Sequence, residues 1–385
     1  MKKELKWIWE SKNFPNFTYA NVNLDNLIYK FGQLKMVENF MNQSDSNELL
    51  LEVLLDEALA TSAIEGEILQ RSSVRSSINK LLRLGLEDDY SYTVASDNLI
   101  EILIDAKTNK EPLTKKRLIA WHKALFPTGS SGLRDITIGS YRTNSQDMQI
   151  VSGSWEKEKI HYVAPSSKVV KKLMDDFLEW LNRRDEQNSI YKAIVAHLYF
   201  VLIHPFEDGN GRIARAITDY ILAGSNLANT NFYSISTIIY KNRKEYYEVL
   251  DNVCKQTNQD ITLWVDWFVK LLEISIDETL QKVKAVQTKA KFWDKHRDTK
   301  LNDRQKKVIL KMLSYLPNKF EGGMRVNKYM NLTKSQRLTA SRDIADLVQK
   351  DIFESFGKGR GVYYELIITM DCFVTSSSKK ALKIY

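Results

Sequence analysis

The chain has 385 residues, which is too many for one ordinary domain and enough for two or three domains with separate hydrophobic cores. Apolar residues make up 43% and charged residues 27% of the chain, as in soluble globular proteins, and no stretch contains the roughly 18 uninterrupted apolar residues of a membrane helix. The net charge is +8 but uneven: residues 281–385 contain 23 Lys and Arg against 10 Asp and Glu, whereas residues 1–280 contain 33 against 38.

The N-terminus lacks the features of a targeting segment. Residues 1–20 begin Met-Lys-Lys and then run into aromatic residues and Pro15, without the apolar core of a signal peptide. We therefore expect a cytoplasmic protein without a membrane anchor, in which this aromatic arm packs on the rest of the chain. Cys254 and Cys372 lie far apart in the sequence, so neither a zinc site nor a disulfide framework is predicted.

Helical periodicity begins at Leu24 and continues to Phe40, and further helices are predicted at about 47–65, 74–84, 92–106 and 114–125. The helix that starts near Asn47 ends in the run Thr61-Ser-Ala-Ile-Glu65-Gly66. Thr61 and Glu65 are four residues apart and share a helix face, and Gly66 suits the turn at a helix C-terminus. Taken by itself, this run is a surface polar pair followed by a helix stop.

The pattern changes between Gly132 and Pro165, where β-branched and aromatic residues alternate with Gly, Asn and Ser. This alternation predicts a β-hairpin or a pair of loops with a polar middle. His122, which precedes it, lies among Trp121, Leu125 and Phe126 and is therefore interpreted as structural.

Two apolar helices, predicted at 190–203 and 213–222, flank a polar turn with the sequence His204-Pro-Phe-Glu-Asp-Gly-Asn-Gly-Arg-Ile-Ala-Arg215. Pro205 ends the first helix, and residues 211–213 open the second. Phe206 is expected to anchor the turn in the core.

The residue types in this turn suit the binding of a nucleoside triphosphate. Gly209, Asn210 and Gly211 precede a helix whose first N–H groups and positive dipole end point at one spot, so they predict a phosphate cradle. Arg212 and Arg215 are three residues apart on the new helix and can both hold further phosphate oxygens. Asp208 is placed to hold a divalent cation, with Mg²⁺ the natural candidate, and His204 is the evident base in the turn.

This string resembles the signature of the Fic family, His-Pro-Phe-x-(Asp/Glu)-Gly-Asn-Gly-Arg-x-x-Arg, and agrees with it at every defined position. The resemblance implies a mainly α fold, a Fic-type helical core with a β-hairpin flap, that transfers the AMP moiety of ATP to a protein hydroxyl and releases pyrophosphate. It also implies a role for each residue of the turn: His204 deprotonates the target hydroxyl, Asp208 holds Mg²⁺, Gly209, Asn210 and Gly211 bind the α and β phosphates, and Arg212 and Arg215 hold the β and γ phosphates.

Three further roles follow from the same resemblance. Thr61, Glu65 and Gly66 match the family's inhibitory motif, in which the glutamate would pair with Arg215 in place of the γ-phosphate. A flap would align the target by main-chain pairing, and His161 would belong to its scaffold. Tyr247 is a candidate contact for the nucleotide base, although core packing explains it equally well. The residues assigned to the flap are Gln149, Ile150, Val151 and Ser152.

From Leu301 onward, helices are predicted at 303–313, 326–330 and 336–348, the last capped by Ser335, and a hairpin follows at 353–366. This order resembles a winged helix-turn-helix domain, with Lys334, Arg337 and Arg342 near the start of the recognition helix. The positive charge of this part hints at DNA contact, but a basic solvated face or a protein docking or dimer module explains it too.

These predictions divide the chain into an N-terminal helical extension with the inhibitory helix (1–110), a Fic catalytic core with its closing helix (111–290) and a winged helix-turn-helix domain (291–385). We expect an AMP-transferase that uses ATP and Mg²⁺ to modify a Ser, Thr or Tyr hydroxyl of a target protein or of itself. Two alternatives stay open: a DNA-binding transcription regulator that uses the pocket as a nucleotide sensor, and an enzyme that removes AMP at the same site. A homo-oligomer is also open.

Overall fold

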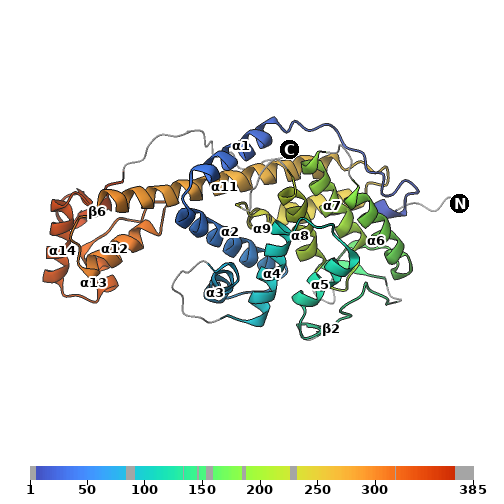
Figure 1. Ribbon diagram of the computed structural model, residues 1–385, viewed down its shortest axis with the longest axis horizontal. Coiled ribbons are helices and arrows are strands. Elements are labelled where there is room, and N and C mark those ends of the chain that lie inside the picture. Colours follow the sequence, from blue (N-terminus) through green and yellow to red (C-terminus); the bar gives the residue numbers. More distant parts are fainter. Residues whose placement is uncertain are drawn as a thin grey trace. The chain divides into compact units, whose positions relative to one another are not determined.

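A computed structural model describes residues 6–83, 92–132, 134–144, 147–152, 159–183, 188–225, 232–316 and 318–368. These residues are mainly helical with short two-stranded hairpins, which confirms that the fold is mainly α (Figure 1). The chain divides into two compact units, residues 1–280 and residues 281–385. None of the described helices is both long and apolar enough to cross a membrane.

The first unit contains a short 3-10 helix at Ile8–Glu10 and then the following helices: α1 (Asp25–Phe40), α2 (Gln43–Ile64), α3 (Arg71–Leu82), α4 (Val94–Thr108), α5 (Lys115–Leu125), α6 (Ser167–Asn182), α7 (Ser189–Ile203), α8 (Asn210–Ala223), α9 (Ile235–Lys241) and α10 (Arg243–Cys254). Helix α11 (Thr262–Lys295) begins in this unit and continues past its end. The strands pair antiparallel as β1 (Ser130–Ser131) with β2 (Arg134–Asp135) and β3 (Gln149–Ser152) with β4 (Lys159–Val163).

Local caps explain where these helices depart from the predicted boundaries. Helix α2 begins four residues before Asn47, because the Asn42 side chain accepts a hydrogen bond from the Asp45 N–H (2.9 Å) and caps it. Helix α9 is absent from the predicted elements, since its β-branched residues weaken the helical pattern, and Ser234 caps it. The helix predicted at 74–84 ends at Leu82, and Leu84 lies outside the described residues.

The core of the first unit is built around α7 and α8, which lie side by side (Figure 1). Helix α7 is apolar on all sides and almost wholly buried, as expected of a central helix. Helix α8 also packs against α4, α5 and α2, and α2 is anchored by α9. Glu57 makes that anchor by accepting hydrogen bonds from the Ser234 hydroxyl (2.8 Å) and the Ser236 N–H (3.0 Å). This packing brings the C-terminal end of α2 to the N-terminal end of α8.

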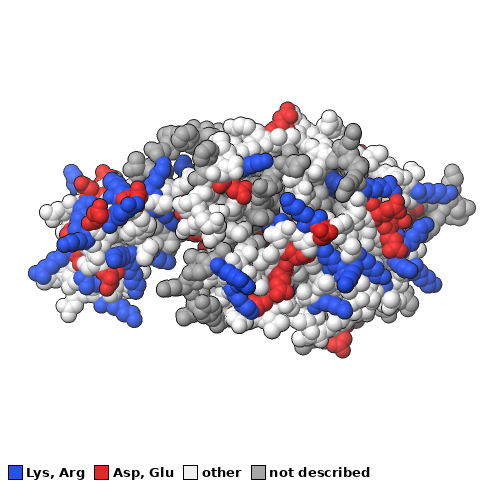
Figure 2. Space-filling view, in the orientation of Figure 1, with Lys and Arg blue, Asp and Glu red and all other residues white. Residues whose placement is uncertain are grey.

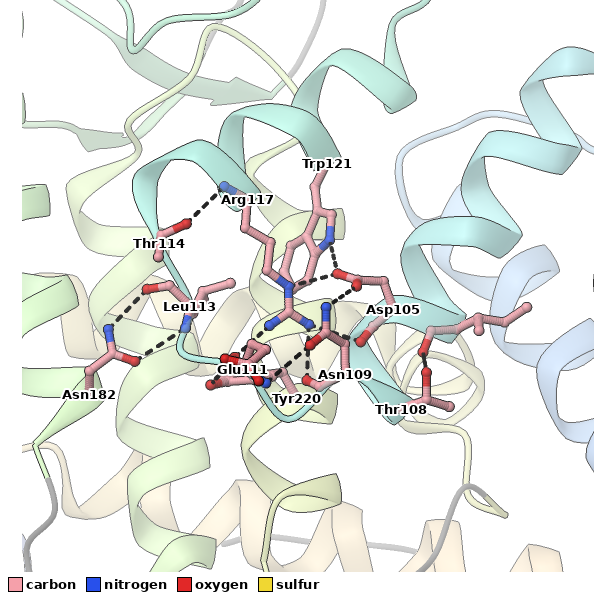
Figure 3. Close-up of polar contacts among 11 residues, drawn as sticks. Asp105, Thr108, Asn109, Glu111, Leu113, Thr114, Arg117, Trp121, Asn182 and Tyr220 are labelled. Carbon is pink, nitrogen blue, oxygen red and sulfur yellow. Dashed lines mark hydrogen bonds and ion pairs between the residues drawn. The ribbon is translucent and has the colours of Figure 1, made fainter.

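A polar corner joins α4, α5 and α8, as Figure 3 shows. The Arg117 guanidinium donates to the Asp105 carboxylate (2.7 Å) and to the Glu111 carbonyl (2.8 Å), and the Trp121 indole donates to the same carboxylate (2.7 Å). Tyr220 of α8 donates to the Glu111 carbonyl as well (3.0 Å). The corner therefore fixes α8 against the turn between α4 and α5.

The aromatic arm packs on the first unit, as predicted. Trp7 is 4% exposed and lies edge to face against Tyr162, with 5.5 Å between the ring centroids. The Trp9 indole donates to the Val163 carbonyl (2.7 Å). Both partners belong to β4, so the arm supports the β3–β4 hairpin.

The second unit contains the predicted order of elements: α12 (Asp303–Leu313), α13 (Val326–Thr333), α14 (Arg337–Gln349) and an antiparallel hairpin of β5 (Phe353–Phe356) and β6 (Tyr363–Leu366). The predicted cap at Ser335 is wrong, because Gln336 occupies the N-cap of α14 and makes no side-chain cap bond. Lys334 has a left-handed backbone (φ 51°), so Ser335 lies inside the turn and pairs with the Thr333 hydroxyl (2.7 Å).

Candidate active site

His204 ends α7 in a left-handed backbone conformation (φ 51°, ψ 59°). Its ring Nδ1 lies 3.3 Å from the Val201 carbonyl oxygen, which can only accept, so Nδ1 carries the hydrogen and Nε2 bears the lone pair. Burial lowers the pKa of His204 from 6.5 to about 4, and the nearby positive charge of Arg142 adds to this effect. The imidazole is therefore neutral at pH 7, which is the form that a general base requires.

Arg142 holds this turn and is absent from the residues predicted from the sequence. It is 2% exposed, its Nε donates to the His204 carbonyl (2.8 Å), and its backbone N–H donates to the Pro205 carbonyl (2.9 Å). A further guanidinium nitrogen donates to the Pro165 carbonyl. Because it lies 62 residues before His204 in an irregular segment, no motif marks it. We identify Arg142 as a positioning residue for the base.

The turn between α7 and α8 is fixed by packing and by its own hydrogen bonds. Phe206 is fully buried and stacks on His122, with ring centroids 4.1 Å apart, which confirms that both residues are structural. The Asn210 side chain accepts from the Phe206 N–H (3.0 Å) and donates to the Phe206 carbonyl (2.8 Å). The Asn210 side chain therefore makes its hydrogen bonds within the turn, and the backbone N–H of Asn210 is the group that can donate to a phosphate.

Two glycines shape the start of α8. Gly209 has φ 79°, and a Cβ at this position would lie 2.9 Å from the Phe126 ring, so a side chain is not tolerated. A Cβ on Gly211 would collide with Glu65 Oε1 and lie 3.2 Å from Arg215 Nη1. The Glu65 carboxylate therefore lies over the first turn of α8, where unpaired helix N–H groups and the helix dipole attract an anion.

Both arginines of α8 are held by residues at the end of α2. Arg215 is 2% exposed and donates from Nη2 to Glu65 Oε1 (2.8 Å) and from Nε to Thr61 Oγ1 (2.8 Å). Arg212 donates to Glu67 (2.7 Å), a residue that is also absent from the predicted set. The Arg212 Nε is buried and has no hydrogen-bond partner among the described residues. Such a donor beside the cradle fits an anionic ligand such as a phosphate.

Gly66 shapes the segment that supplies these carboxylates. It has a left-handed backbone (φ 84°), and the N–H groups of Gly66 and Glu67 bond to the carbonyls of Ala63 (3.1 Å) and Ser62 (3.0 Å). This pair of bonds is a Schellman motif, which needs glycine at the left-handed position. The turn lets two residues that flank Gly66, Glu65 and Glu67, both reach α8.

Asp208 precedes the cradle and accepts a hydrogen bond from the Ser131 hydroxyl. The described residues contain no group of three or more His, Cys, Asp and Glu side chains that could hold a metal ion. A single carboxylate nevertheless suits a Mg²⁺ ion that takes its other ligands from nucleotide phosphates and water. The donor set therefore fits a cation shared with a nucleotide and does not fit a metal held by the protein alone.

The remaining predicted residues lie on α10 and on the hairpin. Tyr247 is 40% exposed, whereas its neighbour Tyr246 is 3% exposed and bonded to His197 (3.2 Å), so Tyr247 has the accessible ring. The predicted flap residues 149–152 form β3, which among the described strands pairs with β4 alone. The other edge of β3 therefore has backbone groups that could pair with a peptide.

Residues 112–222 match the model of the Fic/DOC family, and residues 7–86 match a domain of unknown function, DUF4172. The chain contains a Fic/DOC domain. This domain includes the whole of the turn from His204 to Arg215, while Thr61, Glu65 and Gly66 lie in the N-terminal match. A solved Fic family protein from Desulfovibrio desulfuricans G20 has the same fold, with a TM-score of 0.50 at 20% identity over 94% of this chain and 99% of that chain.

Two relatives found by sequence are named as protein adenylyltransferases. The chain is 33% identical over 86 residues to a probable protein adenylyltransferase of Aquifex aeolicus, which covers 22% of this chain and 24% of the relative. It is 31% identical over 121 residues to a protein adenylyltransferase Fic of Nematostella vectensis, which covers 31% of this chain and 26% of the relative. The chain thus spans about a quarter of the length of these curated relatives.

The protonation state of His204 gives a first testable prediction. In a protein with ¹⁵N-labelled histidine, the NMR shifts of the His204 ring should show a neutral imidazole protonated at Nδ1 from pH 8 down to pH 5. The reason is that burial holds its pKa at about 4, so protonation begins only as the pH falls toward that value. A titration midpoint above pH 6 would contradict this assignment of the base.

The turn at Gly66 gives a second prediction. Gly66→Ala should lower the free energy of unfolding by about 1 kcal/mol, because alanine disfavours the left-handed backbone although no atom lies within 4 Å of the added Cβ. Gly32→Ala is the matched control: Gly32 lies inside α1 with equally open space, so the change should stabilise by about 0.5–1 kcal/mol. Urea unfolding followed by tryptophan fluorescence measures both, and a Gly66→Ala protein at least as stable as the wild type would refute the role of Gly66.

Proposed function

We propose that this protein transfers AMP from ATP to a hydroxyl group of a target protein or of itself, and that the end of α2 inhibits the transfer. The observation that carries the proposal is the neutral His204 imidazole at one end of a rigid turn whose other end presents helix N–H groups and two arginines. The Fic/DOC match over the same residues and the adenylyltransferase names of the relatives support the same reaction.

In this reaction the target oxygen attacks the α-phosphorus of ATP, the bond from that phosphorus to the oxygen bridging the β-phosphate breaks, and pyrophosphate leaves. The hydroxyl proton passes to Nε2 of His204. Negative charge that gathers on the phosphates is stabilised by donors already in place. Mg²⁺, held by Asp208 when bound, would neutralise part of the same charge. The phosphate ligands would be Gly209, Asn210 and Gly211 for the α and β groups, and Arg212 and Arg215 for the β and γ groups.

The end of α2 would inhibit by substitution of one anion for another. Glu65 is bonded to Arg215, with Thr61 on the same guanidinium, so the γ-phosphate has no free partner there. ATP would then bind weakly or with its α-phosphate out of line. The open edge of β3 would align the target by main-chain pairing, and Tyr247 would lie against the base.

Glu65→Gly should raise the incorporation of AMP from labelled ATP into protein by about tenfold or more, because a charge-assisted pair of this kind is worth about 1.5–3 kcal/mol. Adding His204→Ala to that variant should lower the incorporation at least about a hundredfold, as expected for loss of a general base. Mass spectrometry of peptides from a lysate incubated with each variant measures the transfer. Unchanged incorporation by a folded Glu65→Gly protein would refute the inhibition, and transfer without His204 would refute the base.

Removal of AMP at the same site is a second candidate, favoured by the presence of the Glu65 carboxylate over the first turn of α8. A carboxylate in that place could orient a water molecule toward the α-phosphorus of a modified protein. The protein modified by Glu65→Gly can be incubated with the wild type or with fresh Glu65→Gly to distinguish addition from removal of AMP. AMP release by the wild type but not by Glu65→Gly would favour removal.

We also propose that the second unit binds DNA through α14, in the manner of a winged helix-turn-helix domain. The carboxylates of α14 are paired: Asp343 is 7% exposed and bonded to Arg304 (2.7 Å), and Asp346, with a side chain 41% exposed, is bonded to Lys350. Figure 2 shows many Lys and Arg side chains on this unit, with Asp and Glu side chains among them. The outward residues of α14 are Arg337, Leu338, Ser341, Arg342, Ala345 and Gln349.

The DNA proposal predicts a salt-dependent affinity for duplex DNA. Replacing Arg337 and Arg342 by alanine should lower the affinity and reduce the slope of log K against log salt by about one for each phosphate that the protein no longer neutralises. Lys244→Ala is the control, because Lys244 lies in the first unit with a side chain 91% exposed, so its loss lowers the net charge and removes only an exposed pair with Glu248 (3.7 Å). Fluorescence anisotropy with labelled duplex measures the slopes. Equal slopes for the double variant and the wild type would refute the proposal.

A further inference from the structure

Glu67 makes a second ion pair between the α2 turn and α8. Its Oε2 lies 2.7 Å from Nη1 of Arg212, whose side chain is 5% exposed, while the Glu67 side chain is 45% exposed. The Arg212 guanidinium also lies 5.0 Å from the centre of the Phe126 ring, so its position is fixed from two directions. A segment of three residues, Glu65 to Glu67, thus supplies one carboxylate to each of the two arginines of α8.

We propose that Glu67 stands in for the β-phosphate of a nucleotide and makes the site selective for the number of phosphates on its ligand. This inference rests on the proposed function, in which Arg212 holds the β-phosphate and Arg215 the γ-phosphate. A nucleoside monophosphate needs neither arginine. A diphosphate has to displace Glu67 from Arg212, and a triphosphate has to displace Glu65 from Arg215 as well.

The two displacements differ in difficulty because the two ion pairs differ in their exposure to water. Arg215 and Glu65 have side chains 2% and 25% exposed, so little solvent screens their attraction. Glu67 is nearly half exposed, so water and salt weaken its pair with Arg212 and the carboxylate leaves more readily. A diphosphate therefore opens the outer pair while the inner pair stays closed.

The turn couples the two carboxylates. The N–H groups of Gly66 and Glu67 both bond back to the last turn of α2. A displacement of Glu67 therefore disturbs the turn that also holds the Glu65 carboxylate in place. A nucleotide that has displaced Glu67 therefore meets a weakened inner pair, which gives the site a stepwise response to its ligand.

The test is isothermal titration calorimetry of the full chain with AMP, ADP and the α,β-methylene analogue of ATP, which the enzyme cannot cleave. Glu67→Gln should bind ADP and the ATP analogue about three- to tenfold more tightly than the wild type and leave AMP unchanged. Glu65→Gln should tighten the ATP analogue more than ADP. Glu52→Gln is the matched control, because Glu52 pairs with Arg71 and Arg75 at the surface of α2, the helix that precedes the turn with Glu67.

The pattern over the three nucleotides separates this inference from a general effect of charge. Equal tightening of AMP, ADP and the analogue by Glu67→Gln, or ADP affinity equal to that of the wild type, would overturn the role of Glu67. The Glu65→Gly transfer assay tests the proposed function separately. If that variant transfers AMP but Glu67→Gln binds every nucleotide as the wild type does, this inference alone is refuted. Failure of every variant to bind the analogue would refute the proposed function and this inference together.

Discussion

The buried guanidinium of Arg215 is the constraint on which the arrangement of the site depends. A charge withdrawn from water is costly unless an opposite charge and enough acceptors surround it. Arg215 finds the Glu65 carboxylate, the Thr61 hydroxyl and the Thr61 carbonyl (3.1 Å), and all of them come from the end of α2. Helix α2 must therefore end at this place, so the contact between Glu65 and Arg215 is part of how the chain folds rather than an addition to a finished domain.

A second buried ion pair holds α8, and with it Arg215, in place when the Glu65 carboxylate is exchanged for a phosphate. Lys107 of α4 lies 3.1 Å from Asp219 of α8, both with side chains 2% exposed, and burial raises the pKa of Asp219 against the opposing charge of Lys107. Glu57 ties α2 to the N-terminal end of α9 in the same region. Because these contacts hold α8 from behind, a phosphate that replaces a carboxylate meets donors that are already oriented, which is the condition for strong electrostatic stabilisation.

The sequence predicted those parts of the site that are local in the chain. The base, the cradle and both arginines lie within twelve consecutive residues, so the identity and spacing of these residues were enough to find them. Thr61 and Glu65 needed the family resemblance, since their partner Arg215 is 150 residues or more away. Arg142 could not be found, because a buried arginine in an irregular segment shows neither period nor motif. A signal for Glu67 did exist: two arginines three residues apart on one helix need two counter-charges, and a second glutamate follows Gly66.

The difference in burial between α2 and the turn that follows it indicates which part moves when inhibition is released. Moving α2 as a whole would expose Leu51, Leu54 and Leu55, which are at most 2% exposed and contribute about 1.5–3 kcal/mol each, besides breaking the contacts of Glu57. An ion pair at the end of the helix is worth about 1.5–3 kcal/mol, which the phosphates of one nucleotide can replace. Residues 66–68 are exposed and the Glu65 side chain is 25% exposed, whereas Thr61, Ser62 and Ile64 are buried. Release is therefore expected to be a rearrangement of the turn at 65–68 on a helix that stays in place.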